Sequence, residues 1–356
     1  MRLAMLSTAA LLLATSIATA QDGEKTKACF VYVGPTGDFG WTYQHDEGRK
    51  QLEAELGDQV ETAFLESVPE GADAERAIER FARSGCDIVF TTSFGYMDAT
   101  NKVAARFPDV KFEHATGFKR EHPNVSTYNS KFYQGRYVLG QIAAEMSEAG
   151  KAGYIASFPI PEVVRGINAF TLGARSVNPD FTVTPIWVNT WFDPARESDA
   201  AKTLVDQGFD VITQHTDSTA PMQVAAERGV KAFGQASDQI RFGPETQLTA
   251  IIDDWGPYYV QRVKALIDGT YEQIDDWGGL AEGNVAMADY TNMPEDVAQR
   301  AEETEQKILS GEFEPFTGPI MKQDGSEWLA EGQKATEGEL LGLNFYVEGV
   351  QGDLPQ

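Results

Sequence analysis

Short apolar runs alternate with longer amphipathic stretches along the chain from residue 28 onward. The short runs are rich in β-branched and aromatic residues, as buried strands are, and the longer stretches repeat apolar residues at helical spacing. This alternation is typical of βαβ units and predicts parallel sheets covered by helices. The elements predicted in the first series are strand 28–33, helix 41–56, a strand near 64, helix 72–84, strand 86–92, helix 97–106 and short strands near 111–116 and 125–128.

A second series repeats this architecture. Its predicted elements are helix 132–146, strand 153–157, helix 162–177, strand 182–188, helix 195–207, strand 209–214, helix 219–228 and strand 230–235. The repetition indicates two doubly wound lobes, each built on a largely parallel sheet.

The tail after these two series has too few elements for a third domain. It holds a predicted strand at 248–253, a helix with an apolar stripe that includes Tyr259 and Val263, and a short apolar run at 285–288. Each needs a sheet edge or face to join. We therefore expect the chain to return to the first lobe near 248–254 and to the second near 284–290.

The predicted fold class is α/β, with two doubly wound parallel-sheet lobes joined by a three-segment hinge. The expected boundaries are residues 24–127 with 253–282 for the N-terminal lobe, and residues 128–252 with 283–356 for the C-terminal lobe. Hinged lobes close on a ligand held between them. In such sheets the ligand lies at the carboxyl ends of the strands.

The first twenty residues have the pattern of a cleavable export signal, and we expect residues 1–20 to be removed. Arg2 supplies a positive start, an apolar run includes Leu11 and Leu13, and small residues end at Ala20. That run is too short to span a bilayer, which argues against an uncleaved anchor. No cysteine follows the cleavage site to carry a lipid, so we expect release into the periplasm as a mature chain beginning near Gln21.

Two cysteines in an exported chain favour a disulfide. Cys29 and Cys86 each open a predicted strand, so both lie at the starting ends of parallel strands that can be neighbours. Two unpaired buried thiols are the alternative.

The charge balance excludes one class of partner. The 356 residues include 29 Lys and Arg against 54 Asp and Glu, a formal net charge of -25. A strongly acidic surface repels phosphates, so we expect no nucleic-acid partner and no binding to anionic lipid.

The first strand-to-helix turn, residues 34–41, combines three glycines with Asp38, Phe39 and Trp41. It contains neither Gly-Lys-Ser/Thr nor G-x-G-x-x-G, and Asp38 would repel an anion, so a phosphate or dinucleotide site is not expected. The glycines more simply let the turn bend and present the aromatic residues. Trp41 is either a core residue or a ligand contact.

Further aromatic residues occur in loops where the ligand is expected. Ser93, Phe94 and Gly95 follow a strand of the first lobe, and Phe158 and Trp191 follow strands of the second. Single aromatic residues at strand ends more often belong to the core. Their repetition in facing loops favours a ligand site with flat apolar walls from both lobes.

Acidic residues recur at the same level of the fold, at Asp217, Asp238 and Asp254. A carboxylate in an aromatic cleft accepts hydrogen bonds from a ring N–H, an exocyclic amine or a ribose hydroxyl. The alternative roles are helix N-caps and solvated rim acids.

Enzyme signatures are weak. The four histidines have no metal-ligand spacing, neither cysteine lies in a nucleophile motif, and G-x-S-x-G is absent. We expect no catalytic residue, no metal and no cofactor. An exported hydrolase of purine nucleosides or sugars that uses Asp217 and Asp238 is the alternative from another class.

Five stretches carry a resemblance to a known family: VYVGP at 31–35, GDFGW at 37–41, TSFGY at 92–96, QGRYVLG at 134–140 and GQASDQ at 234–239. Together they resemble the basic membrane protein family of ABC-transporter substrate-binding proteins, relatives of the purine nucleoside receptor. The resemblance covers nearly the whole mature chain. It implies a type I periplasmic binding fold, a purine-like ligand stacked on aromatic rings, and an inner-membrane permease as partner.

By this resemblance Asp238 matches the acid that holds the ligand, and Trp41 matches an aromatic residue of the first loop. The chain departs from the nucleoside-binding pattern at Asp253 and Asp254, where we expect a basic residue in many relatives. A free base such as adenine is therefore favoured, with a purine nucleoside as the alternative and a sugar as a third possibility. We expect a monomer in which Trp41, with Phe94 or Trp191, sandwiches the purine while Asp238 accepts hydrogen bonds from it.

Overall fold

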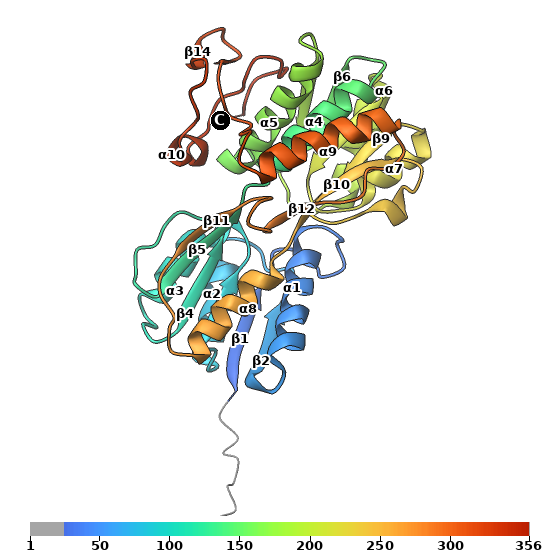
Figure 1. Cartoon of the computed structure of the whole chain (residues 1–356). Coiled ribbons are helices and arrows are strands. Elements are labelled where there is room, and N and C mark those ends of the chain that lie inside the picture. Colours follow the sequence, from blue (N-terminus) through green and yellow to red (C-terminus); the bar gives the residue numbers. More distant parts are fainter. Residues whose placement is uncertain (1–24, 356) are drawn as a thin grey trace, which may run out of the picture.

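The computed structural model describes residues 25–355 and places two six-stranded sheets in two lobes, one above the other in Figure 1. The expected export signal lies outside the described residues. The fold class predicted from the alternating pattern is confirmed.

The first sheet is parallel throughout, in the order β11-β5-β4-β3-β1-β2. Its strands are β1 Thr26–Val31, β2 Val60–Leu65, β3 Ile88–Thr91, β4 Lys111–Ala115, β5 Val125–Ser130 and β11 Asp275–Gly278. Its helices are α1 Trp41–Leu56, α2 Ala72–Arg83, α3 Met97–Ala104 and α8 Gly256–Ile267, with 3-10 turns η1 Gly57–Gln59 and η2 Phe94–Tyr96.

Side-chain alternation along β1 sends successive residues to opposite faces of this sheet. Phe30 packs with residues of α1 and α8 on one face, and Val31 packs with residues of α2 and α3 on the other. The sheet is therefore covered on both sides, as a parallel sheet requires.

The second sheet has the order β12-β10-β9-β8-β6-β7, and only its edge strand β12 runs antiparallel. Its strands are β6 Lys151–Ala156, β7 Thr182–Trp187, β8 Val211–His215, β9 Lys231–Gly234, β10 Gln247–Asp253 and β12 Val285–Met287. The accompanying helices are α4 Tyr133–Met146, α5 Pro161–Val177, α6 Pro194–Asp206, α7 Ala220–Arg228 and α9 Glu295–Leu309, with the 3-10 turn η3 Ile240–Phe242.

The C-terminal segment forms β13 Ile320–Met321, β14 Glu327–Leu329 and α10 Glu337–Leu341. Apolar residues of this segment join the same core cluster as α4 and α5, so the segment belongs to the second lobe.

The chain passes between the two sheets three times, after β5, after β10 and after β11. The passing segments lie side by side: the Lys131 N–H donates to the Gly278 carbonyl (2.6 Å), and the Asp254 N–H donates to the Asn284 carbonyl (3.0 Å). The strand β5 runs to Ser130, beyond the boundary expected at residue 127.

Several elements were not predicted. The edge strand β11 reads Asp-Asp-Trp-Gly, which lacks the β-branched pattern of a strand. The helix α9 buries only Val297, Ala301 and Ile308, so its apolar stripe is too sparse to stand out among its acidic residues.

Cys29 and Cys86 form a disulfide with their Cα atoms 6.1 Å apart, inside the usual span. They are neighbours because β1 and β3 pair in parallel, with Cys29 opposite Val89. The bond lies wholly within the first lobe.

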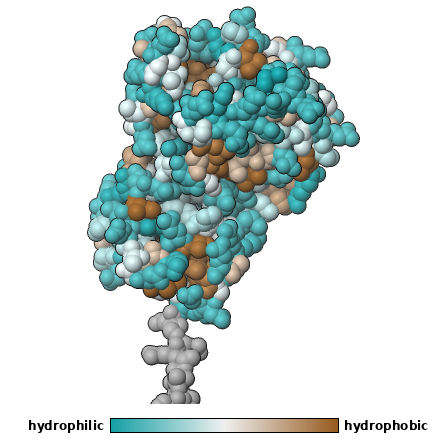
Figure 2. Space-filling model, in the orientation of Figure 1, coloured by the Kyte–Doolittle hydropathy of each residue, from teal (hydrophilic) through white to brown (hydrophobic). Residues whose placement is uncertain are grey.

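The surface visible in Figure 2 is mostly hydrophilic, in keeping with the excess of acidic residues. No helix among residues 25–355 is long and apolar enough to cross a membrane.

Candidate functional site

A cavity lies between the lobes, at the carboxyl ends of both sheets. Both lobes supply its walls, which consist of Val33, Trp41, Ser93, Phe94, Thr116, Glu162, Trp191, His215, Asp217 and Gln235. The position agrees with the rule that ligands of such sheets bind where the strands end.

The aromatic walls come from three loops. Trp41 begins α1, and its indole N–H donates to the Thr92 carbonyl oxygen (2.7 Å), which fixes the plane of the ring. Phe94 lies in η2 of the same lobe, whereas Trp191 belongs to the second lobe and packs against Phe158 with ring centroids 5.2 Å apart. Flat apolar surfaces therefore reach the cavity from both sides and can stack on a planar ligand.

Asp217 is the buried acid of the cavity. It is 3% exposed, and its Oδ2 has no hydrogen-bond partner among the described residues. Burial raises the pKa of Asp217 well above its usual range, and the neighbouring carboxylates of Asp38 and Glu197 raise it further. Buried polar atoms without a partner are rare, so this oxygen is placed to accept a hydrogen bond from a ligand.

Polar groups beside Asp217 complete the lining. Glu162 lies 3.7 Å from the Nε2 of His215, whose pKa is lowered by burial. The Oε1 of Gln235 accepts a hydrogen bond from the Arg136 guanidinium, which leaves the Gln235 amide NH₂ for other partners. The ten lining residues include two carboxylates and no lysine or arginine.

Asp238, the acid favoured by the resemblance, does not line this cavity. It is exposed, and its Oδ1 accepts from the Ile240 N–H (2.9 Å) and from the Gln247 amide (2.7 Å). It therefore stabilises its own turn and the start of β10. Asp254 is also exposed and lies in a separate groove lined by residues of α1.

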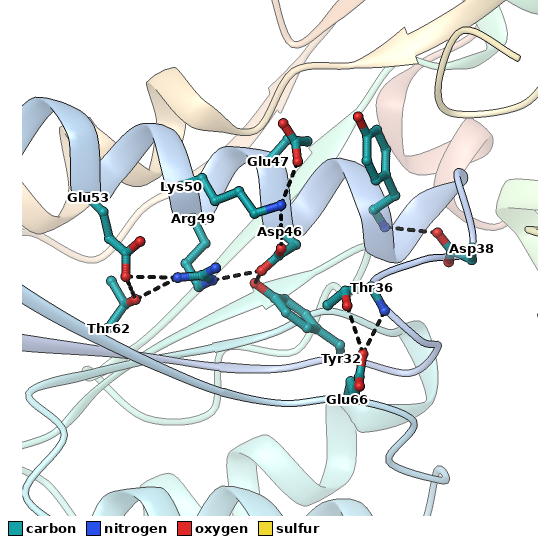
Figure 3. Close-up of polar contacts among 11 residues, drawn as sticks. Tyr32, Thr36, Asp38, Asp46, Glu47, Arg49, Lys50, Glu53, Thr62 and Glu66 are labelled. Carbon is teal, nitrogen blue, oxygen red and sulfur yellow. Dashed lines mark hydrogen bonds and ion pairs between the residues drawn. The ribbon is translucent and has the colours of Figure 1, made fainter. Parts of the chain in front are cut away.

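Asp38 is buried, does not line the cavity and binds the backbone at the start of α1. Its carboxylate accepts from the N–H groups of Gly40 (2.9 Å), Thr42 (3.1 Å) and Tyr43 (2.9 Å), and Figure 3 shows it beside the first turn of the helix. Burial raises the pKa of Asp38 to about 6, although these donors lower it. Its role is that of a helix cap.

Phe39, Gly95 and Phe158 lie next to the lining without forming part of it. Phe39 reaches the second lobe, where its ring lies 3.7 Å from the guanidinium carbon of Arg241 and its carbonyl accepts from the Gln239 amide (3.2 Å). These contacts show that the two lobes are closed on each other.

Five of the lining residues are among those predicted from the sequence: Trp41, Ser93, Phe94, Trp191 and Asp217. The remaining lining residues were not predicted as ligand contacts; they are Val33, Thr116, Glu162, His215 and Gln235. A signal existed for all of these except Glu162, because the other four lie at or directly after the end of a predicted strand.

Comparison of the sequence with known proteins identifies a family for this chain. The Bmp family model, described as ABC transporter substrate-binding protein PnrA-like, matches residues 25–315. The chain is 66% identical over 333 residues to purine-binding protein BAB2_0673 of Brucella abortus, covering 94% of this chain and 95% of that protein. It is 37% identical over 335 residues to putative ABC transporter glucose-binding protein TsgA13 of Haloferax volcanii, covering 94% of this chain and 82% of that protein.

Solved structures show the same fold at lower identity. An ABC transporter solute-binding protein of Aeropyrum pernix has a TM-score of 0.71 at 23% identity, covering 81% of this chain and 92% of that one. A transcriptional activator of the comK gene from Bacillus halodurans has a TM-score of 0.69 at 22% identity, covering 82% and 99%.

Proposed function

Because the chain belongs to the Bmp family of PnrA-like ABC transporter substrate-binding proteins, we propose that it captures a purine in the periplasm and delivers it to an inner-membrane permease. The observation that carries the ligand class is the inter-lobe cavity with aromatic walls and a buried Asp217 oxygen that has no partner within residues 25–355. A purine has a flat ring system that stacks on Trp41, Phe94 or Trp191. Its N–H groups can donate to Asp217.

The lining chemistry disfavours anionic ligands. Asp217 and Glu162 both face the cavity and no lysine or arginine lines it, so a phosphate would meet carboxylates without a compensating charge. A neutral base or nucleoside fits this lining better than a nucleotide.

Adenine is the favoured ligand. Its exocyclic amine donates hydrogen bonds, and a carboxylate can only accept them while it is ionised. The relative with 66% identity is named a purine-binding protein, which supports the class but does not distinguish the bases. A purine nucleoside is the second candidate, since Glu162 and Thr116 could accept hydrogen bonds from ribose hydroxyls.

The transport mechanism follows from the arrangement of the lobes. A ligand shifts an open–closed equilibrium only through its preference for one state, and a ligand in this cavity would touch residues of both lobes. We assign residues 25–130 with 254–282 to one moving lobe and residues 131–253 with 283–355 to the other, because β5 belongs to the first sheet and β10 to the second. The side-by-side passing segments would form the hinge.

Calorimetric titration tests this proposal, with adenine, hypoxanthine, adenosine, ribose and glucose as ligands. Stacking contributes about 1–3 kcal/mol per base, so Trp41→Ala should weaken adenine binding about tenfold to a hundredfold. Asp238→Asn is the control, because Asp238 lies outside the cavity lining, and it should bind as the wild type does.

Tight binding of glucose or ribose without any response to purines would refute the purine assignment. Adenosine binding far more tightly than adenine would instead select the nucleoside. Release of free adenine from adenosine during incubation would show a hydrolase and contradict a purely transporting role.

A further inference from the structure

Glu70 joins the two lobes at the edge of the cavity. It lies between β2 and α2 in the first lobe, and its Oε1 accepts a hydrogen bond from the indole N–H of Trp191 in the second lobe (3.0 Å). Trp191 lines the cavity and Glu70 does not. The bond therefore holds one aromatic wall of the cavity from outside.

The same oxygen also fixes the loop that carries the facing aromatic residue. Oε1 of Glu70 accepts from the Ser93 hydroxyl (2.6 Å) and from the Gly95 N–H (3.2 Å), the two neighbours of Phe94. A Cβ at position 95 would overlap the Glu70 carboxylate, so the carboxylate occupies the space that the glycine leaves free.

We propose that Glu70 is a positioning residue, which orders the Phe94 loop and then holds Trp191 over the ligand when the lobes close. This inference rests on the proposed function, since it assumes that the cavity is the ligand site. The bonds to Ser93 and Gly95 lie within one lobe and persist when the lobes separate, so the acceptor is already in place before closure. Of the three bonds to Glu70 Oε1, only the bond from Trp191 forms when the lobes close.

The hydrogen bond between Glu70 and Trp191 affects ligand binding in two ways. A hydrogen bond from a neutral donor to a carboxylate is stronger than one between neutral groups. It also fixes the rotation of the Trp191 indole, and stacking on a planar ligand requires a defined ring plane. Glu70 thus acts through Trp191 rather than by touching the ligand.

Glu66 provides a matched control on the same segment. Its Oε2 accepts from the N–H (2.7 Å) and the hydroxyl (2.9 Å) of Thr36, and Figure 3 shows both bonds. Both partners belong to the first lobe. Removing Glu66 therefore removes a comparable carboxylate without touching the contact between lobes.

The experiment measures adenine affinity and dissociation rate for Glu70→Ala, Glu70→Gln, Trp191→Phe, Glu66→Ala and the double variant Glu70→Ala/Trp191→Phe. Loss of a hydrogen bond to a charged group predicts about tenfold weaker binding for Glu70→Ala. Most of that loss should appear in the dissociation rate. Trp191→Phe keeps a ring and removes the N–H, so it should show a similar loss.

The double variant should lose less affinity than the sum of the two single losses, because both changes remove the bond between Glu70 and Trp191. Glu70→Gln keeps an oxygen acceptor and should recover part of the affinity, and Glu66→Ala should match the wild type. Strictly additive losses, an unchanged Glu70→Ala variant, or an equal loss in Glu66→Ala would each overturn the proposal.

Small-angle scattering of the ligand-free proteins separates this test from the purine assignment. Glu70→Ala should shift the population toward an open form with a larger radius of gyration, whether or not adenine is the ligand. Superimposable ligand-free curves for Glu70→Ala and wild type would contradict the positioning role. Failure of the wild type to bind adenine would instead contradict the proposed function.

Discussion

Asp38 and Asp217 are both buried acids beside the cleft, and their partners differ. Three backbone N–H groups donate to the Asp38 carboxylate, whereas Oδ2 of Asp217 has no partner among the described residues. An unsatisfied buried polar group costs about 1–3 kcal/mol. Asp38 therefore stabilises the fold. Asp217 lowers the stability of the ligand-free protein, and its free oxygen is available to a ligand.

We expect Asp217→Asn to stabilise the ligand-free protein by about 1–3 kcal/mol, because it replaces a buried acid whose ionised form is disfavoured by burial and by neighbouring carboxylates. The same change should weaken adenine binding at least about tenfold. Thermal unfolding and calorimetry on one preparation measure both effects. Asp38→Ala should lower the free energy of unfolding by about 1 kcal/mol, because it removes a helix cap.

The stability gain of Asp217→Asn should depend on pH in a defined direction. The folded-state pKa of Asp217 is raised by burial, so the folded protein binds this proton more tightly than the unfolded chain does. Wild-type stability contributed by this group therefore increases as pH falls from that raised pKa toward the usual value of 3.8. The advantage of Asn should shrink over the same interval, and an advantage that grows on acidification would contradict this account.

The individual site residues could be predicted only in part. Trp41, Phe94, Trp191 and Asp217 follow strand ends, and that position is visible in the sequence. Asp238 also follows a strand end, but its Oδ1 already accepts hydrogen bonds from the Ile240 N–H and the Gln247 amide. The position of Gln247 depends on how β9 and β10 pair, which a local pattern does not reveal. Acids such as Glu162 in the first turn of a helix usually serve the helix dipole, so the pattern did not mark it as a ligand contact.

At the scale of elements, the turn between β1 and α1 serves both lobes. Gly40 lies so close to the second lobe that a Cβ added there would be 2.5 Å from the Asp217 carbonyl oxygen. Gly37 in the same turn has no atom within 4 Å of an added Cβ. Close backbone approach therefore requires glycine at position 40 and not at position 37.

Gly40→Ala should hinder closure, because the new methyl group meets backbone atoms that can move only with the whole second lobe. We expect about tenfold weaker adenine binding, in line with the cost of overpacking, and a larger radius of gyration with ligand present. Gly37→Ala is the matched control and should close and bind as the wild type does. A Gly40→Ala variant that binds normally would show that the lobes accommodate the methyl group.

Element prediction succeeded where burial is strong on both faces and failed where it is weak. The central strands β1 and β3 are almost wholly buried and gave clear apolar runs. The edge strand β11 and the helix α9 have mostly polar or exposed residues, so their existence depends on what they pack against. That information is absent from a local pattern.

At the scale of the whole molecule, ligand binding and stability are linked. A ligand that binds only the closed, folded protein stabilises it by about 2.7 kcal/mol when present at about a hundred times its dissociation constant. We expect adenine to raise the melting temperature in calorimetric scans, while Trp41→Ala at the same adenine concentration should show a smaller shift. Equal shifts with glucose and adenine would argue against purine selectivity.

The two-lobed architecture could be predicted because the βα alternation occurs twice and the tail supplies only single strands and helices. The closed position of the two lobes could not be predicted from the sequence. It depends on a few contacts such as Phe39 with Arg241 and Trp191 with Glu70, and these lie in loops whose sequence carries no periodic signal.

The three passages between the sheets also constrain how the chain acquires its structure during synthesis. The first sheet needs α8 to cover Phe30 and Phe90, yet Tyr259 and Val263 of that helix are made only after most of the second lobe. The edge strand β11 comes later still. A chain that emerges residue by residue, from a ribosome or from a translocation pore, therefore has one face of its first sheet covered by α1 alone until α8, which ends at Ile267, has appeared. The order of elements favours folding of the chain after its release rather than lobe by lobe.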